Sequence, residues 1–280
     1  MNPSYLGVTL TPFFIDGSQG PLFCLFVPPK DPQGEVLLFL PSFGEELNRC
    51  RVMVAMQARM LAEAGVGCLL LDYYGTGDSA GDFSETRWEQ WLRDAETACA
   101  WLIGQGYTKI GLWGLRLGAV VAAELAAAIP GRFTRLLLWQ PVLEGKVLFT
   151  QFLRIRLAML MDRGEPKETT QQMRERLQAG KPLEVAGYEI SPVLAAALDS
   201  KALVAIRLPA GLQVNWFELT LADQAELSIA SQKVVAAWQS QNVVVVTQFF
   251  SGPAFWQLHE RELTPDLLAK TTGIFLGERT

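Results

Sequence analysis

The sequence is poor in the residues that usually carry metal or redox chemistry. Its 280 residues include one histidine, His259, and four cysteines that lie far apart and form no CxxC pair. This spacing argues against the common zinc and thiol-redox motifs, so we predict no metal and no cofactor. We interpret the four cysteines as reduced, buried thiols of a reducing compartment.

Charged residues and long apolar runs are also scarce. The chain has 24 Lys and Arg against 29 Asp and Glu, a formal net charge of -5, and no basic cluster of the kind that binds nucleic acid. The apolar runs are shorter than the roughly 20 residues of a membrane-spanning helix. No basic segment precedes an apolar stretch near Met1, as a secretory signal requires. We therefore expect a cytoplasmic protein with no nucleic-acid partner and no membrane span.

The chain is rich in hydrophobic residues, and predicted strands alternate regularly with predicted helices. Half of the residues are hydrophobic, and the length suits one large domain. Segments typical of strands alternate with segments typical of helices, which predicts an α/β fold with a mostly parallel central sheet flanked by helices. The predicted strands are 9–15, 22–27, 35–40, 67–72, 109–113, 135–139, 212–219 and 243–250, and the predicted helices are 51–64, 86–103, 117–128 and 265–276.

The strand pattern stops between residues 146 and 200. Two amphipathic helices, 151–163 and 168–179, are predicted there. We interpret this stretch as a helical cap inserted into the sheet domain, although two ordinary packing helices would give the same pattern. We thus expect one domain over residues 1–280, with a core of 1–145 and about 201–280 and a cap of about 146–200.

One short motif indicates how the sheet is used. Gly114 to Gly118 reads Gly-Leu-Arg-Leu-Gly, and it joins a predicted strand to a predicted helix. This is the spacing of the nucleophile elbow G-x-S-x-G, in which small flanking residues allow a sharp turn that lifts the central side chain above the sheet. The central residue here is Arg116. A guanidinium stays protonated and has no lone pair, so it cannot attack a carbonyl group.

Several segments, taken in order, resemble one bacterial family of the α/β-hydrolase superfamily, the exosortase A system-associated hydrolase 2 family. They are PSFGEELNRCRVM, DYYGTGDSAGDF, GLWGLRLG, LLLWQPVLEG, QFLRIRLA, VAGYEISPVLA and SGPAFWQLHE. The resemblance covers nearly the whole chain. It implies an α/β-hydrolase fold related to serine aminopeptidases and esterases. It also implies a link to exopolysaccharide assembly and protein sorting, with a protein partner from such a system.

The resemblance also implies where a catalytic triad would lie. Pro253 stands where the base histidine is expected, and His259 follows six residues later, where a surface position is the commoner case. Glu218, near the end of the strand 212–219, is the nearest candidate for the acid. In this interpretation the triad is degenerate, because Arg116 and Pro253 replace the nucleophile and the base.

A buried guanidinium at the elbow needs a partner. Glu45 or Glu46, on the loop 41–48 that supplies oxyanion-hole N–H groups in the family, is one candidate, and an anionic ligand is the other. The sequence leaves both open. The residues expected to line the pocket are Ser42, Phe43, Glu45, Glu46, Asn48, Tyr73, Arg116, Leu117, Gln140 and Trp256.

Three functions therefore remain open. The first is a non-catalytic or atypical hydrolase that binds an acyl, anionic or saccharide ligand in this pocket. The second is an active serine hydrolase, of esterase or thioesterase type, with a rearranged site around Ser42, Glu46 and His259. The third is an assembly protein that acts through its cap.

Overall fold

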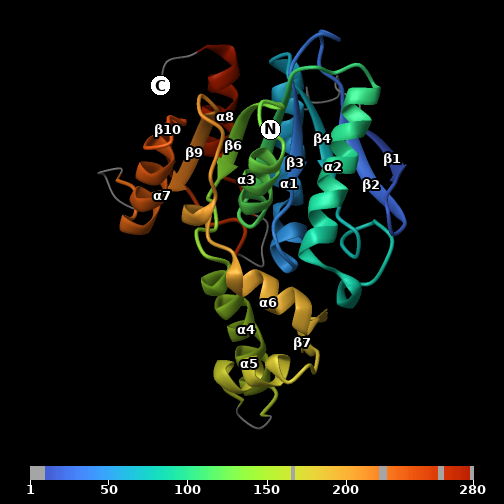
Figure 1. Cartoon of the computed structure of the whole chain (residues 1–280), viewed down its shortest axis with the longest axis vertical. Helices are drawn as coiled ribbons and strands as arrows, with labels where there is room; N and C mark the ends of the chain where they lie inside the picture. Colours follow the sequence, from blue (N-terminus) through green and yellow to red (C-terminus); the bar gives the residue numbers. More distant parts are fainter. Residues whose placement is uncertain (1–9, 165–167, 221–225, 258–261, 278–280) are drawn as a thin grey trace.

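An eight-stranded sheet forms the centre of the molecule in this computed structural model, which describes residues 10–164, 168–220, 226–257 and 262–277 (Figure 1). The strand order is β1-β2-β4-β3-β5-β6-β9-β10. The pairs from β4 to β10 are parallel, and β2 pairs antiparallel with both β1 and β4. The strands are β1 (Thr11–Asp16), β2 (Pro21–Val27), β3 (Val36–Leu40), β4 (Gly67–Leu71), β5 (Ile110–Leu115), β6 (Phe133–Trp139), β9 (Gln213–Leu219) and β10 (Val244–Phe250).

Helices cover both faces of this sheet (Figure 1). Helices α1 (Glu45–Glu63) and α8 (Pro265–Leu276) pack on one face. Helices α2 (Trp88–Gly104), α3 (Gly118–Ala128) and α7 (Ile229–Gln239) pack on the other. Because both faces are covered, the central strands are short, continuous apolar runs, and every residue of β3 and β5 is buried. The predicted mostly parallel sheet flanked by helices is confirmed.

A group of elements between β6 and β9 lies at one end of the sheet, at the bottom of Figure 1. It contains α4 (Gly145–Asp162), α5 (Thr170–Gln178), the hairpin of β7 (Leu183–Val185) and β8 (Tyr188–Ile190), and α6 (Pro192–Ser200). We call these elements the cap. The Phe152 ring of α4 meets Phe43 of the core at 4.9 Å between centroids, and Tyr188 meets Phe83 at the same distance. Aromatic contacts thus seal part of the junction between cap and core.

A partly buried ion pair ties the C-terminal end of α6 to the core. The Lys201 ammonium, just after α6, donates to both carboxylate oxygens of Glu124 in α3 at 2.9 and 3.2 Å. The same carboxylate accepts a hydrogen bond from the indole of Trp88 in α2, and the ammonium lies 4.6 Å from the centroid of that ring. The connection from α6 to the core is therefore held by three elements at once.

Helix α1 begins earlier than the sequence indicates. Its first residue is Glu45, not residue 51, so Glu45, Glu46 and Asn48 lie in the first turns of a helix rather than on a loop. Gly44, with φ 56°, precedes the helix, and two carboxylates suit its positive N-terminal end. The polar run Glu-Glu-Leu-Asn-Arg lacks the periodic apolar residues that mark an amphipathic helix, so the sequence analysis placed it in a loop.

Other elements were not predicted at all. The hairpin β7–β8 and helix α6 lie inside the stretch where the strand pattern stops, and α7 lies between the last two strands. The two hairpin strands have three residues each, too short for a periodic signal. Among the described residues, no helix has both the length and the apolar character needed to cross a membrane.

Candidate functional site

Arg116 occupies the sharp turn between β5 and α3, and its backbone is left-handed with φ 55°. The turn is fixed by main-chain hydrogen bonds. The Arg116 N–H donates to the carbonyl of Trp139 at 3.0 Å, and its own carbonyl accepts from the N–H groups of Ala119 and Val142, each at 3.1 Å. The backbone therefore holds position 116 at the apex without help from its side chain.

Gly118 allows this turn to sit against the neighbouring strand. A Cβ atom at this position would lie 2.0 Å from the carbonyl oxygen of Leu40 at the end of β3, a distance that no real Cβ contact reaches. Only glycine permits α3 to start so close to the sheet. The predicted elbow geometry is thus present, with an arginine at its centre.

The Arg116 guanidinium is neutralised within the protein by Glu46. Its Nε and Nη2 atoms both donate to Oε1 of Glu46 at 3.2 Å, and the two side chains are only 11% and 17% exposed. The guanidinium carbon also lies 5.4 Å from the centroid of the Trp256 ring. Burial raises the pKa of Glu46, and the charges of Arg116 and Arg49 oppose that rise. Of the two predicted partners, Glu46 makes the pair.

Glu45 takes a different role. Its carboxylate accepts a hydrogen bond from the Tyr188 hydroxyl at 3.1 Å, and Asn48 Nδ2 donates to the same hydroxyl at 3.2 Å. Burial, followed by the charge of Glu45, raises the pKa of Tyr188 to about 12, so this hydroxyl stays protonated. Glu45 and Asn48 thereby connect α1 to the cap hairpin.

Two cavities lie against α4, and Arg116 lines the second of them. The apolar chamber, about 390 Å³, is lined by Phe43, Glu45, Glu46, Arg49, Leu148, Gln151, Phe152, Ile155, Ala158, Trp256 and Gln257. The polar chamber, about 310 Å³, is lined by Arg116, Gln140, Pro141, Val142, Leu143, Glu144, Val147, Leu148, Gln151, Glu218, Ser228, Ala230 and Ser231. Because Leu148 and Gln151 border both chambers, the two chambers are adjacent.

Glu218 and Gln140 line the polar chamber, and both side chains already accept hydrogen bonds from within the protein. The Glu218 carboxylate accepts from the Ser228 N–H at 3.0 Å and from the Trp216 indole at 3.1 Å. Gln140 accepts from the N–H of Leu219 at 2.7 Å. The predicted acid thus fastens the end of β9 to the start of α7.

Ser42 is not among the residues that line the two chambers. With Phe43, Tyr73 and Leu117 it lines a cavity of about 10 Å³, room for about one water molecule. The hydroxyl oxygens of Ser42 and Tyr73 are buried, and the Ser42 hydroxyl lies beside the Cys50 thiol. Burial holds the pKa of the Tyr73 hydroxyl well above its usual value. His259, which the rearranged site would need, lies outside the described residues.

Pro253 follows β10, in a turn that leads toward α8. Its carbonyl accepts from the Thr264 hydroxyl at 3.0 Å and from the Phe255 N–H at 2.9 Å. The cap residues Leu148, Gln151, Phe152 and Ile155, which line the chambers, were missed by sequence reasoning. The helical pattern of α4 was visible, but it does not tell which face meets the core.

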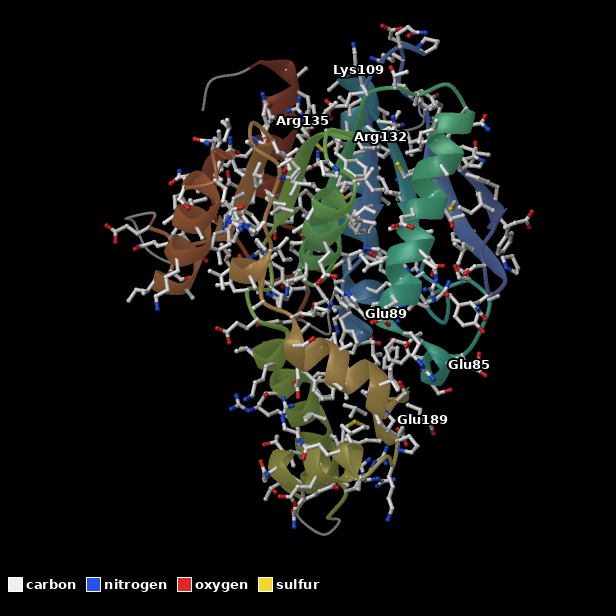
Figure 2. All side chains as sticks on the ribbon, in the orientation of Figure 1. Glu85, Glu89, Lys109, Arg132, Arg135 and Glu189 are labelled. Carbon is white, nitrogen blue, oxygen red and sulfur yellow. The ribbon has the colours of Figure 1, made fainter. Side chains whose placement is uncertain are left out.

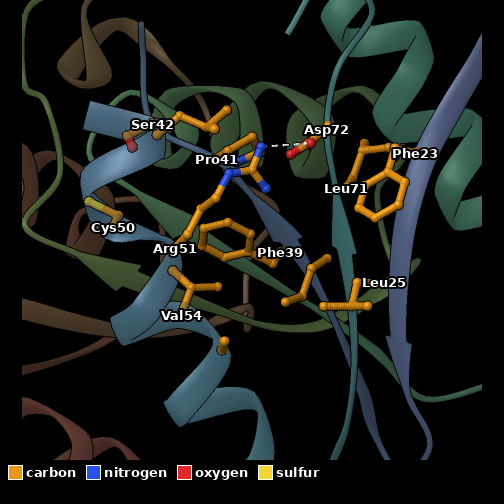
Figure 3. Close-up of a pocket in the computed structure, with 13 residues that line it drawn as sticks. Phe23, Leu25, Phe39, Pro41, Ser42, Cys50, Arg51, Val54, Leu71 and Asp72 are labelled. Atoms are coloured by element: carbon orange, nitrogen blue, oxygen red, sulfur yellow. Dashed lines mark hydrogen bonds and ion pairs between the residues drawn. The ribbon is translucent and has the colours of Figure 1, made fainter. Parts of the chain in front are cut away.

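A separate cavity of about 150 Å³ lies between α1 and strands β2, β4 and β3 (Figure 3). Its wall is mostly apolar, and Arg51 and Asp72 meet at one end, with Nη2 and Oδ2 2.8 Å apart. A Cβ on Gly77 would fall 1.9 Å from Asp72 Oδ2, so the backbone closes directly over this pair. The two charges neutralise each other, and we assign the pair a structural role.

Several charged side chains can be placed relative to the cap. Figure 2 shows the exposed carboxylates Glu85, Glu89 and Glu189 near the junction of core and cap, whereas Arg132 and Arg135 lie toward the opposite end of the sheet. No group of three or more metal-binding side chains occurs within the described ranges.

Comparisons with known proteins agree with this architecture. A family model described as serine aminopeptidase, S33, matches residues 32–206. A putative hydrolase from Agrobacterium vitis S4 is 17% identical, with a TM-score of 0.59 over 97% of this chain and 98% of the other. Est1E from Butyrivibrio proteoclasticus, solved with ferulic acid, is 15% identical, with a TM-score of 0.62 over 95% and 98%. At such identities these likenesses show the α/β-hydrolase fold alone. A search of curated proteins found no match.

Proposed function

Because the chain belongs to the serine aminopeptidase S33 family of α/β-hydrolases, we propose that it is a non-catalytic member that binds an acyl ligand beside its elbow. The observation that carries this proposal is the Arg116–Glu46 pair at the apex of the turn. A protonated guanidinium has no lone pair for attack on an ester or amide carbon. Loss of a triad nucleophile alone costs about 10⁶ in kcat in a well-studied serine protease.

The two chambers indicate the class of ligand. The apolar chamber presents Phe43, Phe152 and Ile155 to a ligand and is suited to an acyl chain. The polar chamber presents amide, hydroxyl and carboxylate groups and is suited to a hydroxylated head group such as a saccharide. A free anion is less favoured than the sequence suggested, because Glu46 already neutralises Arg116 and Glu218 lies in the polar chamber.

The first test concerns catalysis. The purified protein should not react with a fluorophosphonate probe and should not hydrolyse p-nitrophenyl butyrate above the buffer rate. Labelling that maps to a serine lining either chamber would contradict the proposal, and so would ester turnover that survives repurification.

The second test concerns binding. An alkyl glucoside such as octyl glucoside, used below its micelle concentration, should raise the melting temperature in a saturable way. Ile155→Trp, which fills the apolar chamber, should abolish the shift. Met161→Trp, at an exposed position near the end of the same helix, should not. Equal shifts in the two variants would exclude the apolar chamber as the binding site.

The alternative hydrolase built on Ser42 has weaker support. Its hydroxyl is buried, and its polar neighbour among the described residues is the Cys50 thiol, whose pKa is raised by burial, so no base is positioned to activate it. Ser42→Ala should therefore change neither probe labelling nor ester turnover.

We further propose, from the resemblance to exosortase A-associated hydrolases, that the natural ligand is an acylated saccharide precursor of exopolysaccharide in the cytoplasm. Native mass spectrometry of protein purified from an exopolysaccharide-producing bacterium tests this. A bound mass that releases a fatty acid and a sugar on hydrolysis supports it, and a bound mass without sugar contradicts it.

A further inference from the structure

We infer that the ligand presents a secondary amide, not an ester, to the Arg116–Glu46 end of the apolar chamber. This inference rests on the proposed function and specifies its ligand class. The evidence consists of two buried polar atoms that lack partners. Glu46 Oε2, an acceptor, and Trp256 Nε1–H, a donor, each have no hydrogen bond within the described part of the chain.

Both atoms belong to one site. Glu46 and Trp256 line the same chamber, and both contact the Arg116 guanidinium, Glu46 through its ion pair and Trp256 through its ring face. Buried polar groups almost always have hydrogen-bond partners, so two unpartnered atoms on residues that contact Arg116 are unusual. A ligand that supplies one donor and one acceptor would satisfy both.

The ion pair itself is incomplete. Nε and Nη2 share the single oxygen Oε1 at 3.2 Å each, whereas an optimal guanidinium–carboxylate pair uses both oxygens in two parallel bonds. Both unpartnered atoms are covered in this state, so a ligand reaches them only when neighbouring side chains shift. Arg116 also lines the polar chamber, which gives its side chain space to move into.

A secondary amide is the acyl linkage whose hydrogen bonding matches these atoms. Its N–H can donate to Glu46 Oε2, and its C=O can accept from Trp256 Nε1–H. An ester or a tertiary amide has no donor and would leave the carboxylate oxygen unpaired. A free carboxylate would add a second negative charge beside Glu46. A site with committed polar groups discriminates strongly against analogues that leave them unpaired.

Matched ligands test this inference by calorimetry at pH 8. N-butylhexanamide, butyl hexanoate and N-methyl-N-butylhexanamide differ only in the linkage. The secondary amide should bind at least about tenfold more tightly than the other two. Equal affinities within about twofold would overturn the inference while leaving acyl binding intact. Binding of none of the three would instead contradict the proposed function.

Two tryptophans provide a matched pair of variants. Trp256→Phe keeps a ring beside the guanidinium but removes the donor, so the preference for the amide should fall below about threefold. Trp113→Phe removes another buried, unpartnered indole N–H of the same core, outside the chambers, and should keep the full preference. An unchanged preference in Trp256→Phe would exclude this donor.

A spectroscopic readout does not depend on the folding of either variant. In the wild-type protein, the indole ¹H–¹⁵N resonance of Trp256 should move downfield on addition of the secondary amide, and that of Trp113 should stay in place. A Trp256 resonance that the amide leaves unmoved at saturation would overturn the inference.

Discussion

Replacing Arg116 with asparagine tests whether the buried ion pair stabilises the elbow. Asparagine tolerates the left-handed backbone of position 116, so the change removes the guanidinium without adding backbone strain. At the observed 3.2 Å, the attraction is about 5 kcal/mol at an effective dielectric constant of about 20. Desolvation of both groups and their residual exposure offset part of this. We expect the free energy of unfolding to fall by about 2–3 kcal/mol at pH 8, because Glu46 is left buried without its partner.

Urea denaturation at two pH values separates charge from packing. At pH 5, Glu46 can take up a proton more easily, so the loss should shrink to under about 1 kcal/mol. Glu46→Gln in the same background should recover most of the loss at pH 8. Arg51→Asn serves as the control: Asp72 is 7% exposed but keeps a hydrogen bond from the Asp78 N–H at 3.0 Å, and Arg51 is 41% exposed, so this loss should be smaller, about 1 kcal/mol. A loss below about 0.5 kcal/mol at pH 8, or an equal loss at both pH values, would refute the reasoning.

Three further predictions concern the pH response, the elbow and the cap. Burial raises the pKa of Glu46 above 4.5 in the folded protein, so folding takes up a proton. The free energy of unfolding should therefore fall as the pH rises from 4.5 through the raised pKa, by at most about 1.4 kcal/mol per pH unit. Glu46→Gln should remove this pH dependence in thermal melts. Gly118→Ala should prevent folding or cost several kcal/mol, because its Cβ meets the Leu40 carbonyl, and soluble yield with urea denaturation checks this. Lys201→Met should cost about 1–3 kcal/mol by leaving Glu124 without its cation, and limited proteolysis should then cleave the cap faster.

The sequence predicted the sheet and the elbow because both leave strong local signals. Buried strands read as short apolar runs, and the glycines on each side of Arg116 mark a turn that only small residues allow. The choice between Glu45 and Glu46 was beyond local reasoning. Once both lie on a helix, successive residues point about 100° apart, so one faces the elbow and the other faces Tyr188.

The lining of the chambers was not predictable for a similar reason. Phe152 and Ile155 belong to an amphipathic helix, and their spacing indicates a buried face without indicating what buries it. The tertiary packing of α4 against the elbow decides that, and it joins residues more than thirty positions apart in the chain.

The left-handed turn at position 116 also makes this scaffold a convenient host for engineered chemistry. Main-chain bonds to Trp139 and Val142 fix the apex whatever side chain it carries. An oxygen nucleophile introduced by Arg116→Ser would inherit that location without a redesigned backbone. The remaining work would be confined to side chains, with an imidazole introduced within reach of that oxygen and the unpaired carboxylate removed by Glu46→Gln.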